Sequence, residues 1–317
     1  MDLISVMYFT EVVKDANITR TAERLFLSQQ TLSNHMARLE SELGTTLFVR
    51  RPAFSLTPSG EQFLNYARTV TREYANLQNR ISDIEKQDRG TISFGASTLR
   101  MSSCLPAILP RFHERFPNVE IRIADSISRH MIPRVIRGEL DMAIVILNEE
   151  IPVLETTELM EDRLYLCVSD PLLTKVYGER AAGLKEKSFR GAALKDFAEL
   201  PFCLYSNILG NKVRGIFEAE NIIPHAYVTS TYTQIGVDLC LRGLAACVAS
   251  QMNLTNLKEI PKDLNIFPLY HENVPQTQEL SLIWRKDRYL SVYAKFFIEL
   301  LTEYFRSVEA RKIIQKV

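Results

Sequence analysis

The apolar residues near the N-terminus predict two short helices with a very short connection. The first set has the spacing of one buried helical face and comprises Ile18, Ala22, Leu25 and Phe26. The second set repeats at intervals of four, three and four residues and comprises Leu32, Met36, Leu39 and Leu43. Thr19 and Ser28 are suited to be the N-caps of these helices. Because only Leu27 and its neighbours separate the two helices, we expect a crossed helix-turn-helix pair.

The polar side of the second helix is suited to contact DNA. Its side chains can bond to base edges or phosphate oxygens, and they are Gln29, Gln30, Ser33, Asn34 and Arg38. A solvated face without a partner is the alternative, since helical periodicity says nothing about partners. The short connection favours DNA reading. The segment that follows is predicted to be a basic hairpin wing, with Arg50 and Arg51 as phosphate contacts and Thr57 on its far strand.

A helix over residues 3–16 is expected to complete the core of this small unit. Asp2 is suited to cap it, and its apolar face comprises Val6, Phe9, Val12 and Val13. The N-terminal part of the chain is therefore predicted to be a compact three-helix unit with a wing.

After Gly60 the pattern changes to one long helix that reaches about Asp88. Apolar residues alternate four and three positions apart, and they are Phe63, Ala67, Val70, Tyr74, Leu77, Ile81 and Ile84. This is the spacing of a coiled-coil seam, which favours pairing with a second copy of the chain. Packing of the helix onto its own domain is the alternative.

Beyond Gly90 the chain alternates strands with helices, which predicts an α/β fold with a mostly parallel sheet covered on both sides. A second round of alternation follows Asp170. We expect two lobes, 89–168 with 269–317 and 169–268, joined by crossings near Ser169 and Pro268. The segment from Tyr177 to Gly191 is expected to be a charged loop. Two such lobes would form a clamp with a cleft, which is the architecture of periplasmic solute-binding proteins.

The cleft is expected at the carboxyl ends of the strands, where turns lead into helices. Polar residues follow several predicted strands or open the next helix, and they are Ser97, Thr98, Arg100, Ser128, Ser206 and Thr233. Helix N–H groups, hydroxyls and the Arg100 guanidinium would favour a small anion, since no carboxylate is near Arg100 in the sequence. Capping and solvation are the alternative role for each of these residues.

Composition limits the classes of function. Lys+Arg and Asp+Glu number 38 each, so the chain lacks the strongly basic balance of a non-specific nucleic-acid binder. No apolar run approaches the ~20 residues of a membrane span, and the first residues lack a signal-peptide pattern. We therefore expect a cytoplasmic protein with no membrane contact.

No pattern in the chain predicts catalysis. The sequence has neither a glycine-rich phosphate motif nor a nucleophile elbow. The five histidines are scattered and the five cysteines form no C-x-x-C pair, so we expect no metal, no cofactor and no catalytic residue. Buried thiols are the expected state of the cysteines, and a disulfide switch is not expected.

The N-terminal sequence resembles the LysR-type transcriptional regulators. The matching residues include Thr19, Ala22, Glu23, Arg24, Leu25, Ser28, Gln29, Leu32, Ser33, Leu39, Glu40, Leu43, Gly44, Leu47, Phe48, Arg50, Leu56, Thr57 and Gly60. The sequence departs from the family pattern at Thr21, Gln30, Asn34 and His35. The resemblance continues through RFHERFPNVE, GELDMAI, RGLAACVAS and WRKDRYLS, and so spans nearly the whole chain.

This resemblance implies three parts: a winged helix-turn-helix head (1–59), a dimerising linker helix (60–88) and a two-lobed effector-binding domain (89–317). It also implies binding to double-stranded DNA, a homodimer that assembles further into a tetramer, and a small effector that alters the geometry of the heads. The alternative is a solute-binding or enzymatic α/β protein with an appended dimerisation helix.

Overall fold

The computed structural model describes residues 1–49, 53–85, 89–147, 149–257 and 259–313. The chain divides into two compact units. The first unit comprises Met1–Gly90 together with Asp287–Val292, and the second comprises Thr91–Lys286 together with Tyr293–Val317.

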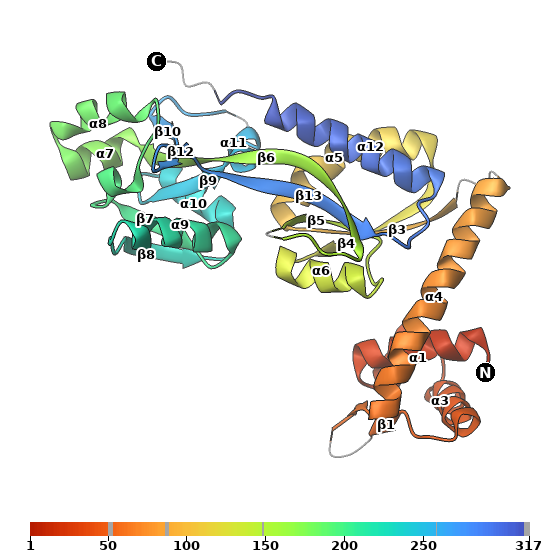
Figure 1. Ribbon diagram of the computed structural model, residues 1–317. Coiled ribbons are helices and arrows are strands. Elements are labelled where there is room, and N and C mark those ends of the chain that lie inside the picture. The colour runs from red at the N-terminus through yellow and green to blue at the C-terminus, as the bar shows by residue number, and fades with distance from the viewer. Residues whose placement is uncertain (50–52, 86–88, 148, 258, 314–317) are drawn as a thin grey trace. The chain divides into compact units, whose positions relative to one another are not determined.

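The first unit is a helical head followed by one long helix (Figure 1). Its elements are α1 (Leu3–Asp15), α2 (Ile18–Arg24), α3 (Gln29–Leu43), β1 (Phe48–Val49), β2 (Ser55–Leu56) and α4 (Pro58–Ile84). The apolar faces of the helices meet in one core, whose buried members include Val6, Phe9, Val12, Ala22, Leu32, Met36, Leu39, Phe63 and Ala67. Strands β1 and β2 pair antiparallel, with Phe48 opposite Leu56.

Two predicted helix caps are confirmed and one is wrong. Asp2 accepts a hydrogen bond from Ser5 N at 2.7 Å, and Ser28 accepts one from Thr31 N at 3.0 Å. Helix α2, however, begins one residue before Thr19 and is capped by Asn17, whose Oδ1 accepts from Arg20 N at 3.0 Å. Asparagine is at least as good an N-cap as threonine, so the upstream cap prevails.

The prediction that Phe26 lies on a buried helical face is also wrong. Helix α2 ends at Arg24, and Phe26 has a left-handed backbone with φ of 56°. This conformation turns its side chain outward, and the ring is 97% exposed. The turn between α2 and α3 therefore breaks the periodicity that the sequence suggested.

Helix α4 begins two residues earlier than predicted, at Pro58, and Thr57 is its N-cap rather than part of the far strand. The Thr57 hydroxyl accepts from Gly60 N at 2.9 Å and donates to Thr46 O at 2.6 Å. At Gly60 a Cβ atom would lie 2.1 Å from the backbone oxygen of Leu47. Only glycine therefore allows the first turn of α4 to approach the chain that enters β1.

The apolar stripe of α4 divides into two parts. Phe63 and Ala67 are buried in the core of their own head. For these two residues, the alternative in which the helix packs onto its own domain is therefore correct. Further along, Tyr74, Leu77, Ile81 and Ile84 are exposed, with Leu77 at 52% and Ile84 at 79%. We call these four residues the exposed stripe.

The second unit is an α/β fold with two lobes (Figure 1). Lobe I contains β3 (Arg89–Ala96), α5 (Thr98–Arg115), β4 (Asn118–Asp125), α6 (Ser128–Ile136), β5 (Met142–Ile146) and α12 (Val292–Glu309). Lobe II contains α7 (Asp170–Tyr177), α8 (Arg180–Ser188), η1 (Leu194–Phe197), β7 (Pro201–Tyr205), α9 (Ile208–Ala219), β8 (His225–Ser230), α10 (Thr233–Leu241), β9 (Ala246–Ser250), α11 (Gln251–Thr255), β10 (Leu264–Pro268), β11 (Tyr270–His271) and β12 (Val274–Pro275).

Two long strands join the lobes. They are β6 (Leu154–Ser169) and β13 (Thr277–Arg285), which pair antiparallel from Thr277 opposite Arg163 to Arg285 opposite Leu154. Among the described residues the sheet runs β4-β3-β5-β13-β6-β9-β7-β8, with β10 also on β6. Pairing is parallel between β3 and β5 and between β7 and both of its neighbours. The sheet is therefore mixed rather than mostly parallel, because the chain returns through β6 and β13 between the lobes.

The charged segment from Tyr177 to Gly191 was expected to be a loop, but most of it is helix α8. Ala181 is buried there and Leu184 packs against the lobe II core. Lys185 pairs with Asp170 at 2.6 Å. A short helix with few apolar residues has a weak periodic signal, which explains the error.

All five cysteines are free and buried, as predicted. Three of them lie side by side on neighbouring strands, with Cys247 opposite both Cys167 and Cys203. Cys240 of α10 also lies within hydrogen-bonding reach of the Cys247 thiol. No spacing in the sequence indicates this clustering, because the four residues come from four elements.

Candidate functional site

The exposed polar side chains at the start of α3 form the candidate DNA-reading face. Gln29, Gln30 and Asn34 are exposed, and Ser33 is half-buried beside them. The Gln30 Nε2 donates to Asn34 Oδ1 at 2.8 Å, which orients both amides in one pair. Such amides can each bond to two atoms of a base edge in the major groove.

The remaining predicted DNA contacts are placed differently. Arg38 forms an ion pair with Asp2 and donates to Ser5 Oγ at 2.9 Å, so it joins α3 to the start of α1. The pKa of Asp2 lies below its usual value, chiefly because of the bond from Ser5 N and further because of Arg38. The Thr57 hydroxyl is occupied by the α4 cap. Arg50 and Arg51 lie outside the described residues.

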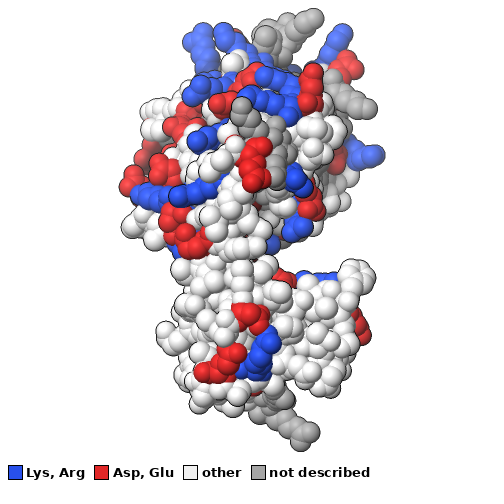
Figure 2. Space-filling view, turned by 90° about the vertical axis from the view of Figure 1, so that its right-hand side faces the viewer, with Lys and Arg blue, Asp and Glu red and all other residues white. Residues whose placement is uncertain are grey.

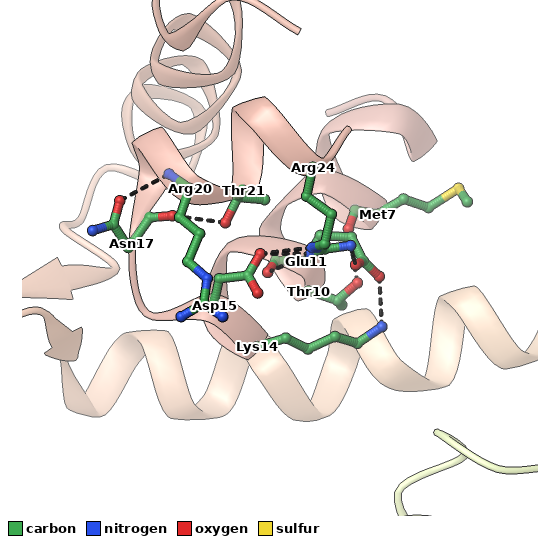
Figure 3. Close-up of polar contacts among 9 residues, drawn as sticks. All are labelled: Met7, Thr10, Glu11, Lys14, Asp15, Asn17, Arg20, Thr21 and Arg24. Atoms are coloured by element: carbon green, nitrogen blue, oxygen red, sulfur yellow. Dashed lines mark hydrogen bonds and ion pairs between the residues drawn. The ribbon is translucent and has the colours of Figure 1, made fainter. Parts of the chain in front are cut away.

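A group of ion pairs joins α2 to α1 (Figure 3). Arg24 reaches from α2 to two acidic residues of α1, at 2.8 Å from Glu11 and 2.7 Å from Asp15. Glu11 also accepts from Lys14 at 2.5 Å. The bond to Asp15 raises the pKa of Arg24, and the same bond lowers the pKa of Asp15.

The second unit contains a cavity of about 770 Å³, lined from both lobes. Five of the predicted effector residues line it, namely Ser97, Thr98, Arg100, Ser128 and Thr233. Ser206 does not line it, whereas its neighbour Asn207 does. The size falls within the range of sites for small organic molecules.

Three of these hydroxyls are already used within the protein. Thr98 donates to Asp125 Oδ2 at 2.7 Å, and Ser128 Oγ accepts from Ile146 N at 3.0 Å. Thr233 Oγ1 accepts from Asn253 Nδ2 at 3.0 Å. Only Thr98 donates its O–H in these bonds, whereas Ser128 and Thr233 accept, which leaves their own O–H groups free to donate to a ligand.

Arg100 has a carboxylate neighbour that the sequence did not indicate. Asp162, from β6, is buried in the cavity wall, and its charge acts on Arg100. Burial raises the pKa of Asp162 to about 6, while bonds from Ser250 and Met252 N and the charge of Arg100 oppose that rise. Burial also lowers the pKa of Arg100 to about 10. The expectation that no carboxylate neutralises Arg100 is therefore wrong, because folding places β6 beside α5.

Two nitrogen-bearing side chains of the cavity wall, Arg100 and Gln278, have donors that bond to no described residue. Among the described residues, none accepts a hydrogen bond from the Arg100 guanidinium. Gln278, which is 91% buried on β13 directly opposite Asp162, has an unpaired Nε2 within the described structure. A buried donor without a partner, such as Gln278 Nε2, is costly, and the half-buried Arg100 guanidinium also remains free to bond to a ligand that brings acceptors.

Sequence reasoning missed Asp162 and Gln278. Asp162 lies in the interior of β6, a segment that the sequence pattern does not identify as a strand, and Gln278 lies at the amino end of β13 rather than at the carboxyl end of a strand.

Other kinds of site receive no support from the described residues. They contain no group of three or more His, Cys, Asp or Glu side chains placed to hold a metal ion. No described helix has the length and apolar character needed to cross a bilayer. On the face shown in Figure 2, Lys and Arg side chains lie among Asp and Glu side chains, in keeping with the zero net charge.

Two family models match the chain. The model described as "LysR substrate binding domain" matches residues 85–306. The model described as "Bacterial regulatory helix-turn-helix protein, lysR family" matches residues 3–61.

Relatives of similar length match over nearly their whole sequences. The Hca operon transcriptional activator HcaR of Escherichia coli is 29% identical over 317 residues, covering 98% of this chain and 100% of the relative. An uncharacterised HTH-type transcriptional regulator, YcgK of Bacillus subtilis, is 25% identical over 312 residues, covering 96% and 94%.

Solved structures share the fold. A variant of full-length OxyR from Pseudomonas aeruginosa has a TM-score of 0.68 at 20% identity, covering 99% of each chain. Full-length CbnR in complex with its target DNA has a TM-score of 0.58 at 19% identity, covering 97% of this chain and 100% of that one.

Proposed function

The chain belongs to the LysR family of DNA-binding transcriptional regulators, which are not enzymes, and from this membership we propose how it reads DNA and what controls it. Residues Gln29, Gln30, Ser33 and Asn34 of α3 contact base edges of the operator, and the wing arginines Arg50 and Arg51 contact phosphates. Because the chain is neutral overall, binding depends on specific contacts more than on bulk charge. Chromosomal DNA as the ligand places the protein in the cytoplasm.

A homodimer forms through the exposed stripe of α4. Tyr74, Leu77, Ile81 and Ile84 keep the four-and-three spacing of a seam and have little cover within their own unit. A second copy would bury them and hold two heads at a fixed separation on DNA. Further assembly into a tetramer follows from the resemblance to the family.

The effector is a small organic acid bound in the cavity. The carrying observation is the pair of unpartnered donors, the Arg100 guanidinium and Gln278 Nε2, in a cavity that also has apolar walls. A carboxylate offers acceptors only, so it satisfies both donors, and its carbon skeleton fills the space against Leu99, Ile127 and Ile146. Asp162 and Asp125 in the same wall disfavour multiply charged anions.

The acid acts by favouring one arrangement of the two lobes. Its contacts come from β13 and from α5 in lobe I and from α9 to α11 on the other side of the cavity. A ligand with equal affinity for the open and closed arrangements of the lobes would not change the separation or angle of the heads on DNA. Closure therefore stabilises one separation or angle of the heads.

A thermal-shift screen of the full chain tests this proposal. At 100 times the dissociation constant, a bound acid adds about 2.7 kcal/mol, which raises Tm by several degrees. We expect this with at least one of a set of monocarboxylates that includes benzoate and butyrate. Arg100→Met should abolish the shift. Arg111→Met should keep it, since Arg111 is an exposed arginine of the same helix, α5, and pairs with Glu303 of α12.

The anionic effector is wrong if no carboxylate stabilises the native chain, or if Arg100→Met responds as the native chain does. Specific DNA binding is tested separately by a gel-shift with the DNA upstream of the gene, against random DNA of equal length.

A further inference from the structure

Helix α4 carries a polar stripe on a different face from its apolar one. Arg72, Asn76, Arg80 and Asp83 follow one another at intervals of four, four and three residues, so they share one side of the helix. All four contact residues 287–292, which we call the bridge segment. This segment belongs to the first unit, although it connects β13 to α12 along the chain.

Asn76 holds the backbone of the bridge segment with both ends of its amide. Its Oδ1 accepts from Tyr289 N at 3.1 Å, and its Nδ2 donates to Asp287 O at 3.2 Å. The side chain is only 4% exposed, although it lies in the middle of a long helix. Such a bond pair needs a donor and an acceptor in one side chain, which excludes Asp, Leu and Ala.

Asp83 caps a helix that is distant in the sequence. Its carboxylate accepts from the N–H of Val292, the first residue of α12, at 3.2 Å, and from the Tyr289 hydroxyl at 2.9 Å. The hydroxyl bond raises the pKa of Tyr289. An acidic side chain at a helix N-terminus satisfies an unpaired N–H and interacts favourably with the helix dipole.

Two further contacts complete the attachment. Arg72 Nη2 lies 3.3 Å from the Asp287 carboxylate. The Arg80 guanidinium lies 5.1 Å from the centre of the Tyr289 ring. The bridge segment is thus held at its start by Arg72 and Asn76 and at its end by Asp83.

The covalent neighbours of the bridge segment lead to the cavity. Strand β13 carries Gln278 in the cavity wall and ends at Arg285, just before the bridge segment. The segment then passes directly into α12, with no free linker between them. A displacement along β13 therefore reaches the segment that α4 holds.

We propose that Asn76 and Asp83 are positioning residues that couple the cavity to α4, the helix that follows the DNA-binding head, through the bridge segment. They fix the junction of β13 and α12 on α4. A conformational change of the lobes therefore alters the conformation of α4, and binding of DNA by the head alters that of β13. This inference rests on the proposed effector response for its biological purpose. Its test needs no effector, because coupling between two sites acts in both directions.

Hydrogen exchange of the full chain, with and without the DNA fragment from the gel-shift, is the test. On binding DNA, the native chain should change exchange of the bridge segment, β13 and the first turn of α12 by at least threefold. In the double variant Asn76→Ala/Asp83→Ala, the change should stop within residues 1–84 while DNA affinity stays within about threefold. Gln78→Ala, an exposed neighbour on α4 outside the polar stripe, should behave as the native chain.

Asp83→Asn separates coupling from general damage. The amide oxygen of the new side chain can still accept from Val292 N. The single variant, in which Asn76 is unchanged, should therefore keep most of the change in hydrogen exchange that DNA binding causes. The inference is overturned if the native chain shows no change beyond α4 on binding DNA, or if the double variant transmits the change undiminished. A negative acid screen with a positive exchange result would refute the anionic effector and leave this coupling intact.

Discussion

The head and the cavity use polar residues in opposite ways. In the head, the reading residues of α3 follow one another within a single helix and face outward. In the cavity, Arg100, Asp162 and Gln278 come from three elements and face inward, where burial shifts pKa values and leaves donors unpaired. Polar residues on an outward surface stay hydrated, so they cost the folded protein little free energy until a partner binds. In the inward site, the burial of charged and unpaired polar groups lowers the stability of the unbound protein.

The largest effect is expected at the exposed stripe of α4, which is apolar and faces outward. Leu77→Glu should convert the dimer to monomers, because burying an unpaired carboxylate against its twin costs several kcal/mol. Gln78→Glu places the same charge one residue further along and should leave the dimer intact. Light scattering measures both masses, and a dimeric Leu77→Glu chain would remove the stripe from the interface.

The buried carboxylate should make stability depend on pH in the reverse of the usual sense. With its pKa raised from 3.8 to about 6, Asp162 keeps a proton in the folded state that the unfolded chain loses. Its contribution to the free energy of unfolding should therefore fall by roughly 2–3 kcal/mol as pH rises from about 4 to 6.

Asp162→Asn should lack this fall. Urea unfolding at pH 4 and pH 7 measures it as the difference between the native and variant chains, while Asp125→Asn in the same cavity wall is the control. Equal pH dependence of the native and Asp162→Asn chains would mean that Asp162 is charged throughout this range.

Substitutions on the DNA-reading face of α3 should change the preference for operator over random DNA without changing the fold. Gln29→Ala and Ser33→Ala should each reduce the preference for operator over random DNA by about 1–3 kcal/mol. Ser41→Ala, at the far end of the same helix, should leave that preference unchanged. Competition gel-shifts measure the ratio of the affinities for operator and random DNA. If Gln29→Ala and Ser33→Ala both leave this ratio unchanged, another element reads the operator.

The smallest effect is expected at the ion pairs between α1 and α2. Arg24 contacts Glu11 and Asp15 at the surface, where water screens the attraction (Figure 3). Arg24→Ala should therefore lower the free energy of unfolding by about 1 kcal/mol or less. A loss above about 2 kcal/mol in urea unfolding would show that this surface group determines the stability of the head.

Local features were predictable from the sequence, and features made by distant segments were not. Ser28 could be recognised as a cap because its partner is three residues away. Thr57 was misplaced because its role depends on Gly60 and on Thr46, which lies across the wing. The first predicted cavity residues were found because strand ends meet at one edge of a sheet.

Asp162 could not be found in that way. Its partner Arg100 is in α5, and β13 and α11 supply its other neighbours. The same holds for the clustered cysteines, which no spacing in the sequence connects.

The cap that Asp83 provides has a practical consequence for anyone who divides this protein into pieces. A fragment that begins at Arg89, after the long helix, keeps α12 but loses the carboxylate that bonds to its first N–H. It also loses both Asn76 bonds to the backbone at Asp287 and Tyr289. A fragment that begins before Arg72 retains every one of these contacts, so the natural place to cut lies inside α4 rather than at its end.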